Sequence, residues 1–193
     1  KDVNGQDSLV LGNMNQTFTY NITSKVPVNI NGFTKYVLTD DLEDVLVTSQ
    51  DLVTIRVNGS IDTSLLEYVS VENNNVVTLD IPMNILENYR GKLIVVSIDA
   101  KIKDEVITAE LDKYVDGTIP NIANITVGDN PGDSYDTNEV PVTPPKGDEP
   151  TIDKAIFGFD GSQLNPTEVN LESLDEEFIY YVNVHVADNV NGY

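Results

Sequence analysis

The sequence of 193 residues contains no cysteine, no tryptophan and a single histidine, His185. The lack of cysteine excludes disulfides and thiolate metal centres. One histidine on an expected strand gives no basis for a Ser-His-Asp triad or a multi-histidine zinc site. A glycine-rich loop that could cradle phosphates is also missing. Several common classes of enzyme are therefore disfavoured before any positive feature is considered.

Basic residues and long apolar runs are scarce as well. There are 11 lysines and arginines against 32 acids, a formal net charge of −21. Nucleic-acid binders need a cationic surface, so no nucleic-acid partner is expected. This charge favours solubility, or affinity for divalent cations or a basic partner. No run of 18 apolar residues is present, so no membrane insertion is expected. No signal peptide opens the sequence, and an export signal and any anchor are expected outside it.

The residues that are abundant favour strands: valine, isoleucine, leucine, threonine and tyrosine, with asparagine and glycine between the apolar segments. From Phe18 to Ile22, apolar and polar residues alternate as in a half-buried strand. Further short strands are expected at Lys35–Leu38, Leu52–Val57, Leu66–Val71, Val76–Ile81, Lys92–Lys103 and Ile122–Val127. Helical periodicity is confined to Asn84–Tyr89. This pattern predicts an all-β fold, an antiparallel Ig-like β-sandwich.

A proline-rich stretch divides the chain. Val140–Pro150 holds four prolines in eleven residues and is typical of an extended connector. We therefore expect a domain at 1–143, a linker at 144–150 and the N-terminal part of a second, similar domain at 151–193.

The opening of the chain returns after this linker. Lys1-Asp2-Val3-Asn4-Gly5-Gln6-Asp7 is similar to Lys154-Ala155-Ile156-Phe157-Gly158-Phe159-Asp160. Downstream, Phe18-Thr19-Tyr20 is similar to Phe178-Ile179-Tyr180, although the spacing from lysine to tyrosine is 19 positions in one case and 26 in the other. Repetition of this kind indicates an array of similar domains.

The first 145 residues resemble a known family, the fimbrial isopeptide-forming domain of Gram-positive pilus shafts and adhesin stalks. The resemblance lies in Phe18-Thr19-Tyr20-Asn21-Ile22, then Val26-Pro27, then Thr39-Asp40-Asp41-Leu42, and finally Pro120-Asn121-Ile122-Ala123. The family has threonine where this chain has Ile122. The resemblance implies a cell-wall-attached, extracellular protein that is not an enzyme acting on other molecules. Its partners would be neighbouring similar domains or pilin subunits, and a host ligand.

In this family a lysine amine attacks an asparagine amide, releases ammonia and leaves an isopeptide bond. The chemistry requires a neutral amine, a protonated carboxyl group and close contact, which burial provides. The resemblance assigns Lys1 as the amine, Asp40 as the catalytic acid and Asn121 as the acceptor, with Phe18 and Tyr20 as an apolar wall. Asp41 is an alternative acid on the opposite face of the strand, and Asn124 and Asn138 are alternative acceptors. Lys154 is the corresponding lysine of the second domain.

Other features are weaker. Asp129, Asp133 and Asp136 crowd oxygen ligands into a glycine-containing loop, which could hold Ca²⁺, but the EF-hand spacing is absent. No other cofactor is expected. The first hypothesis is a structural stalk or pilus-shaft module in which a covalent tie joins the first and last strands. The alternative is an adhesive module that recognises a host protein or glycan. A hydrolase with paired acids ranks last.

Overall fold

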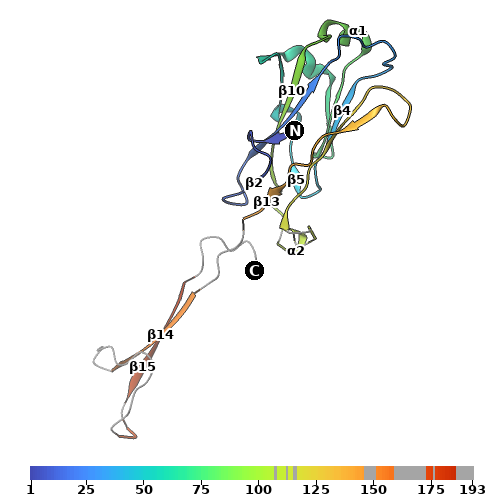
Figure 1. Ribbon diagram of the computed structural model, residues 1–193. Helices are drawn as coiled ribbons and strands as arrows, with labels where there is room; N and C mark the ends of the chain where they lie inside the picture. Colours follow the sequence, from blue (N-terminus) through green and yellow to red (C-terminus); the bar gives the residue numbers. More distant parts are fainter. Residues whose placement is uncertain are drawn as a thin grey trace. The chain divides into compact units, whose positions relative to one another are not determined.

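The computed structural model describes residues 1–106, 108–111, 113–114, 117–145, 151–158, 173–175 and 177–185. The chain divides into two compact units, Lys1–Pro145 and Lys146–Tyr193 (Figure 1). The expected linker at 144–150 spans this division, and its residues 146–150 lie outside the described residues.

The first unit contains two large antiparallel sheets. The first sheet has the order β1 (Asp2–Val3), β3 (Phe18–Lys25), β10 (Leu93–Ile102), β6 (Val53–Val57) and β7 (Ser60–Ile61), with β5 (Leu46–Val47) also paired to β10. The second has the order β12 (Ser134–Asp136), β11 (Ala123–Thr126), β4 (Val37–Asp41), β9 (Val76–Asp80) and β8 (Val69–Glu72). The expected antiparallel β-sandwich is confirmed.

Strand alternation forms the core between the sheets. On β3, Phe18, Tyr20 and Ile22 are buried while the intervening residues are partly exposed, as the sequence pattern predicts. Leu38 and Asp40 of β4 are buried in the same way from the second sheet. A carboxyl group thus occupies a position that alternation would normally give to an apolar side chain.

Short elements close the unit. β2 (Leu9–Val10) pairs in parallel with β13 (Val142–Thr143), the last strand of the unit. Helical elements among the described residues include α1 (Met83–Leu86), α2 (Thr108–Leu111) and the 3-10 helices η1 (Gln50–Leu52), η2 (Thr63–Tyr68) and η3 (Glu87–Tyr89). Among the described residues, no helix is long and apolar enough to cross a bilayer.

The structure shifts two expected strands. The one expected at Leu66–Val71 begins only at Val69, because Asp62 accepts a hydrogen bond from Ser64 N and caps the 3-10 helix η2. The one expected at Lys35–Leu38 begins at Val37 and continues to Asp41. Asp40 therefore lies within a strand and not in a turn.

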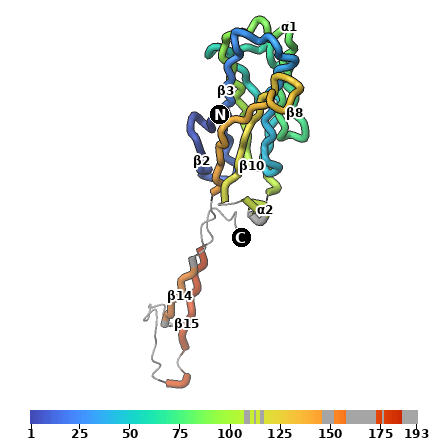
Figure 2. Tube along the Cα trace, turned by 45° about the vertical axis from the view of Figure 1, so that its right-hand side comes forward, coloured from blue at the N-terminus to red at the C-terminus, as the bar shows by residue number. Residues whose placement is uncertain are grey.

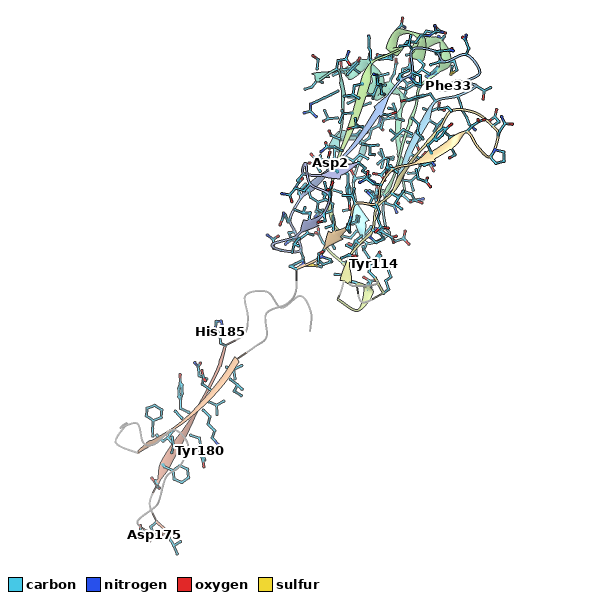
Figure 3. The ribbon with its side chains drawn as sticks, in the orientation of Figure 1. Asp2, Phe33, Tyr114, Asp175, Tyr180 and His185 are labelled. Carbon is cyan, nitrogen blue, oxygen red and sulfur yellow. The ribbon has the colours of Figure 1, made fainter. Side chains whose placement is uncertain are left out.

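The described part of the second unit contains a pair of antiparallel strands, β14 (Thr151–Gly158) and β15 (Phe178–His185). Figure 2 shows the two strands running side by side. Tyr180 and His185, labelled in Figure 3, both lie on β15. All described side chains of β15 are exposed, and most of them are apolar or aromatic.

Candidate functional site

A buried ion-pair partner of Lys1 lies on the opposite sheet. Lys1 immediately precedes β1, whose Asp2 is labelled in Figure 3. Its Nζ lies 2.6 Å from Oδ1 of Asp40 on β4, and both side chains have no solvent exposure. A lysine and an aspartate are rarely so deeply buried unless they contact each other. The pair therefore joins the edge of the first sheet to the middle of the second.

Strand register places Asn121 beside the same carboxyl group. Asp40 pairs with Ala123 across β4 and β11, and Asn121 lies two residues before Ala123, on the same face. Asn121 Nδ2 donates to Asp40 Oδ2 at 3.3 Å, and the residue is only 3% exposed. The Asn121 backbone is fixed because its carbonyl accepts a hydrogen bond from Val140 N at 2.9 Å.

Aromatic rings form one wall of this site. Val3 pairs with Tyr20 across β1 and β3, which brings the Tyr20 ring under the Lys1 side chain. Lys1 Nζ lies 4.8 Å from the centroid of that ring, and Phe18 packs edge-on against Tyr20 with centroids 5.3 Å apart. The rings exclude water from the amine.

Burial acts on both members of the Lys1–Asp40 pair. Desolvation lowers the pKa of the Lys1 amine, against the opposing effect of the Asp40 charge and hydrogen bond. Desolvation likewise raises the pKa of the Asp40 carboxyl, against the effects of Lys1 and Asn121. Both shifts favour a neutral amine beside a protonated acid. These are the protonation states that amide transfer to Asn121 would require.

Comparisons with known proteins show which proteins share this fold. No family model matches the sequence. Platelet adherence protein A of Streptococcus gordonii is 34% identical over 196 residues, an alignment that covers 100% of this chain and 5% of that protein. The major pilin subunit BcpA of Bacillus cereus matches with a TM-score of 0.59 and 20% identity, over 97% of this chain and 55% of the pilin. The chain has the fold of Gram-positive pilin domains.

A second pilin has the same architecture. SpaA, the major pilin of Corynebacterium diphtheriae, matches with a TM-score of 0.50 and 16% identity, over 91% of this chain and 49% of SpaA. Its structure is described as pointing to a modular pilus assembly with stabilizing isopeptide bonds. The resemblance to pilin and adhesin domains is thus confirmed for the fold, while this chain spans only part of each of these proteins.

The alternative site residues of this pilin-like domain lie elsewhere. Asp41 is exposed on the outer face of β4. Asn124 Nδ2 donates to Asp136 at 2.7 Å, outside the contact with Asp40. Asn138 is exposed and holds the Lys1 backbone, since its Oδ1 accepts from the Lys1 nitrogen at 2.8 Å and its Nδ2 donates to the Lys1 carbonyl at 3.0 Å. Sequence reasoning missed this clamp, because no local signal links residues 137 positions apart.

The three loop aspartates considered for Ca²⁺ have separate partners. Asp129 pairs with Lys35 at 2.9 Å, Asp133 accepts from Asn130, and Asp136 accepts from Asn124. In the part of the chain that the structure describes, no group of three or more acidic or histidine side chains is arranged to hold a metal ion.

Lys154 repeats the setting of Lys1 in one respect. Ile156 pairs with Tyr180 across β14 and β15, as Val3 pairs with Tyr20, so each lysine lies two residues before the partner of a tyrosine. Lys154 Nζ lies 3.7 Å from the centroid of the Tyr180 ring. Lys154 itself is exposed. The two lysines therefore share the same register against a tyrosine of the neighbouring strand, and the second, similar domain stays a prediction.

Proposed function

We propose that the first unit is a load-bearing stalk or shaft module of a Gram-positive cell-surface protein, locked by an isopeptide bond between Lys1 and Asn121. The observation that carries the proposal is the buried contact of Lys1, Asp40 and Asn121 from three separate strand regions. A salt bridge in this position contributes little net stability, because desolvation opposes the attraction of the charges. A crosslinking reaction among Lys1, Asp40 and Asn121 would explain why these three side chains are buried together.

The reaction needs only the groups present. The neutral Lys1 amine attacks Cγ of Asn121, forming the new C–N bond, and the carbonyl electrons move onto Oδ1. The protonated Asp40 delivers its proton to Nδ2 and takes one back from the attacking nitrogen, so it ends in the form in which it began. The C–Nδ2 bond then breaks, ammonia leaves, and the carbonyl re-forms as a secondary amide. Folding supplies the proximity that turns two unreactive side chains into an intramolecular pair.

The similar proteins support the proposed role. SpaA is a pilin described with stabilizing isopeptide bonds, and the Streptococcus gordonii relative is named for platelet adherence. We infer an extracellular, cell-wall-attached location and, as partners, similar neighbouring domains. The crosslink is a single self-modification, so the module is not an enzyme that turns over substrate. The name of the Streptococcus gordonii relative also favours a second candidate, an adhesive module for a host protein or glycan.

Intact mass of the folded protein tests the proposal. We expect a mass below the sequence mass by one ammonia. Asp40→Ala and the isosteric Asp40→Asn should restore the full mass while circular dichroism still reports the sandwich. Asp41→Ala is the matched control, since Asp41 neighbours Asp40 but is exposed, and it should keep the loss. A full sequence mass in the unmutated, folded protein would overturn the crosslink.

A further inference from the structure

Two buried polar atoms at this site have no hydrogen-bond partner. They are the Tyr20 hydroxyl and the Asn121 carbonyl oxygen Oδ1, and no other buried side-chain nitrogen or oxygen among the described residues is left in this state. One is a donor and the other an acceptor. An unpaired buried polar group costs about 1–3 kcal/mol, so two such atoms in one site call for an explanation.

The Tyr20 side chain touches both reacting groups. Its ring lies against the Lys1 amine, 4.8 Å from centroid to Nζ, and the residue has no solvent exposure. The polar Asn121 side chain is near enough to the Tyr20 hydroxyl to lower its pKa, yet neither that hydroxyl nor Asn121 Oδ1 makes a well-formed hydrogen bond. Burial, and then the Asp40 charge, raise the pKa of Tyr20, so the phenol keeps its proton and remains a donor.

We propose that Tyr20 is a catalytic residue of the crosslinking reaction, its hydroxyl donating a hydrogen bond to Asn121 Oδ1 as that oxygen becomes an oxyanion. The inference rests on the proposed function and deepens it.

The missing ground-state hydrogen bond is consistent with this role. A donor accelerates a reaction only if it binds the transition state more strongly than the ground state. A hydroxyl left unpaired beside the amide, in a water-excluded site, is free to bond when charge develops on the oxygen. The atom balance of the reaction is unchanged, since Tyr20 donates a hydrogen bond and transfers no proton.

Removal of one hydroxyl tests the inference. Chain recovered unfolded from inclusion bodies is refolded, and ammonia loss is followed by intact mass over time. Tyr20→Phe keeps the ring against Lys1 and should slow the loss by about 100-fold, in the range seen when an oxyanion donor is removed. Tyr36→Phe is the matched control, because Tyr36 is equally buried but its hydroxyl bonds Ser24 Oγ at 2.8 Å. It should crosslink at the unmutated rate.

A stability measurement separates catalysis from packing. In the Asp40→Ala background, where no crosslink forms, adding Tyr20→Phe should leave the melting temperature unchanged or raise it, because the hydroxyl has no partner to lose. An unmutated rate in Tyr20→Phe, or a lower melting temperature in the double variant, would overturn the inference. If the unmutated chain itself never loses ammonia, the proposed function fails instead.

Discussion

In the buried Lys1–Asp40 pair, one proton can reside either on the Lys1 amine or on the Asp40 carboxylate. In water the proton would rest on the amine, since the ordinary pKa values are 10.5 for lysine and 3.8 for aspartate. Burial raises the free energy of the ion pair, in which both groups are charged, more than that of the pair in which both groups are neutral. Burial therefore favours the neutral pair, in which Lys1 is a nucleophile and Asp40 is a proton donor, over the ion pair. The reactivity of the site depends on which of the two groups holds the proton.

The rate of crosslinking should depend on pH with an optimum between the two folded pKa values. The reactive form has a neutral Lys1 and a protonated Asp40. Acid protonates the amine below the Lys1 pKa, which is lowered from 10.5, and alkali removes the Asp40 proton above a pKa that is raised from 3.8. Ammonia loss during refolding at a series of pH values measures this profile. A rate that keeps rising with pH would show that Asp40 does not act as an acid.

Asparagine variants should separate the acceptor from its neighbours. Asn121→Ala should abolish ammonia loss, because no other amide contacts Asp40 among the described residues. Asn124→Ala should keep it, since Asn124 bonds Asp136. Asn138→Ala should slow it by loosening the Lys1 backbone, yet leave the final mass unchanged. Peptide mapping of the crosslinked fragments checks the assignment, and a Lys1–Asn124 or Lys1–Asn138 crosslink would contradict it.

At the scale of elements, alternation and turn chemistry could be read from the sequence. The buried face of β3 follows from Phe18, Tyr20 and Ile22, and the turn from β6 to β7 follows from Asn58-Gly59, whose φ angles of 49° and 87° suit a two-residue hairpin. The bounds of β8 could not be predicted, because capping by Asp62 competes with strand propensity.

Only part of the candidate site could be predicted from the sequence. Alternation on β4 distinguishes Asp40 from Asp41, but it does not say which strand lies alongside. The meeting of Asp40 with Asn121 depends on the register of β4 against β11, between residues about 80 positions apart. The resemblance to a known family suggested that pairing, and local pattern could not have done so. The expectation that the tie joins the first and last strands is wrong in its placement of the acceptor, because Asn121 precedes β11 and the last strand of the unit is β13.

The described strands of the second unit should be the first target of proteolysis. A two-stranded ribbon is marginal in water, and the described side chains of β15 are all exposed. Limited digestion should cut between residues 151 and 185 while a fragment close to Lys1–Pro145 survives. Mass spectrometry of the products checks this. Resistance of the second unit equal to that of the first would mean that its apolar face is covered in solution.

Lys154 should remain free in this chain. It is exposed, and its ammonium lies over Tyr180 with no carboxylate salt-bridge partner within 4.0 Å among the described residues. The ammonia loss should therefore be one molecule and not two, and Lys154→Ala should leave it unchanged. Loss of two ammonia molecules would show that the second unit completes a reactive site of its own.

At the scale of the whole first unit, the proposed bond closes a loop from Lys1 to Asn121. A crosslink of this length removes unfolded-state entropy equivalent to about 5 kcal/mol by analogy with a disulfide. Asp40→Ala, which prevents the bond, should therefore unfold at a clearly lower temperature than Asp41→Ala, measured by calorimetry. Equal melting temperatures would contradict the presence of a stabilising crosslink, since the two substitutions differ in the bond they permit.

Force along the chain would follow the same bond. Pulling on Lys1 and Pro145 loads the Lys1–Asn121 link directly, so residues 2–120 are bypassed and only the segment 122–145 can lengthen. That segment is held to the sandwich by the pairing of β11 with β4, of β13 with β2, and by the hydrogen bond from Val140 to Asn121. Its full extension adds at most roughly 80 Å, against roughly 500 Å for an uncrosslinked unit. Single-molecule stretching should show the short extension in the unmutated protein and in Asp41→Ala, and the long one in Asp40→Ala. A long extension in all three would mean that load passes through the hydrogen-bonded strands and that no covalent path exists.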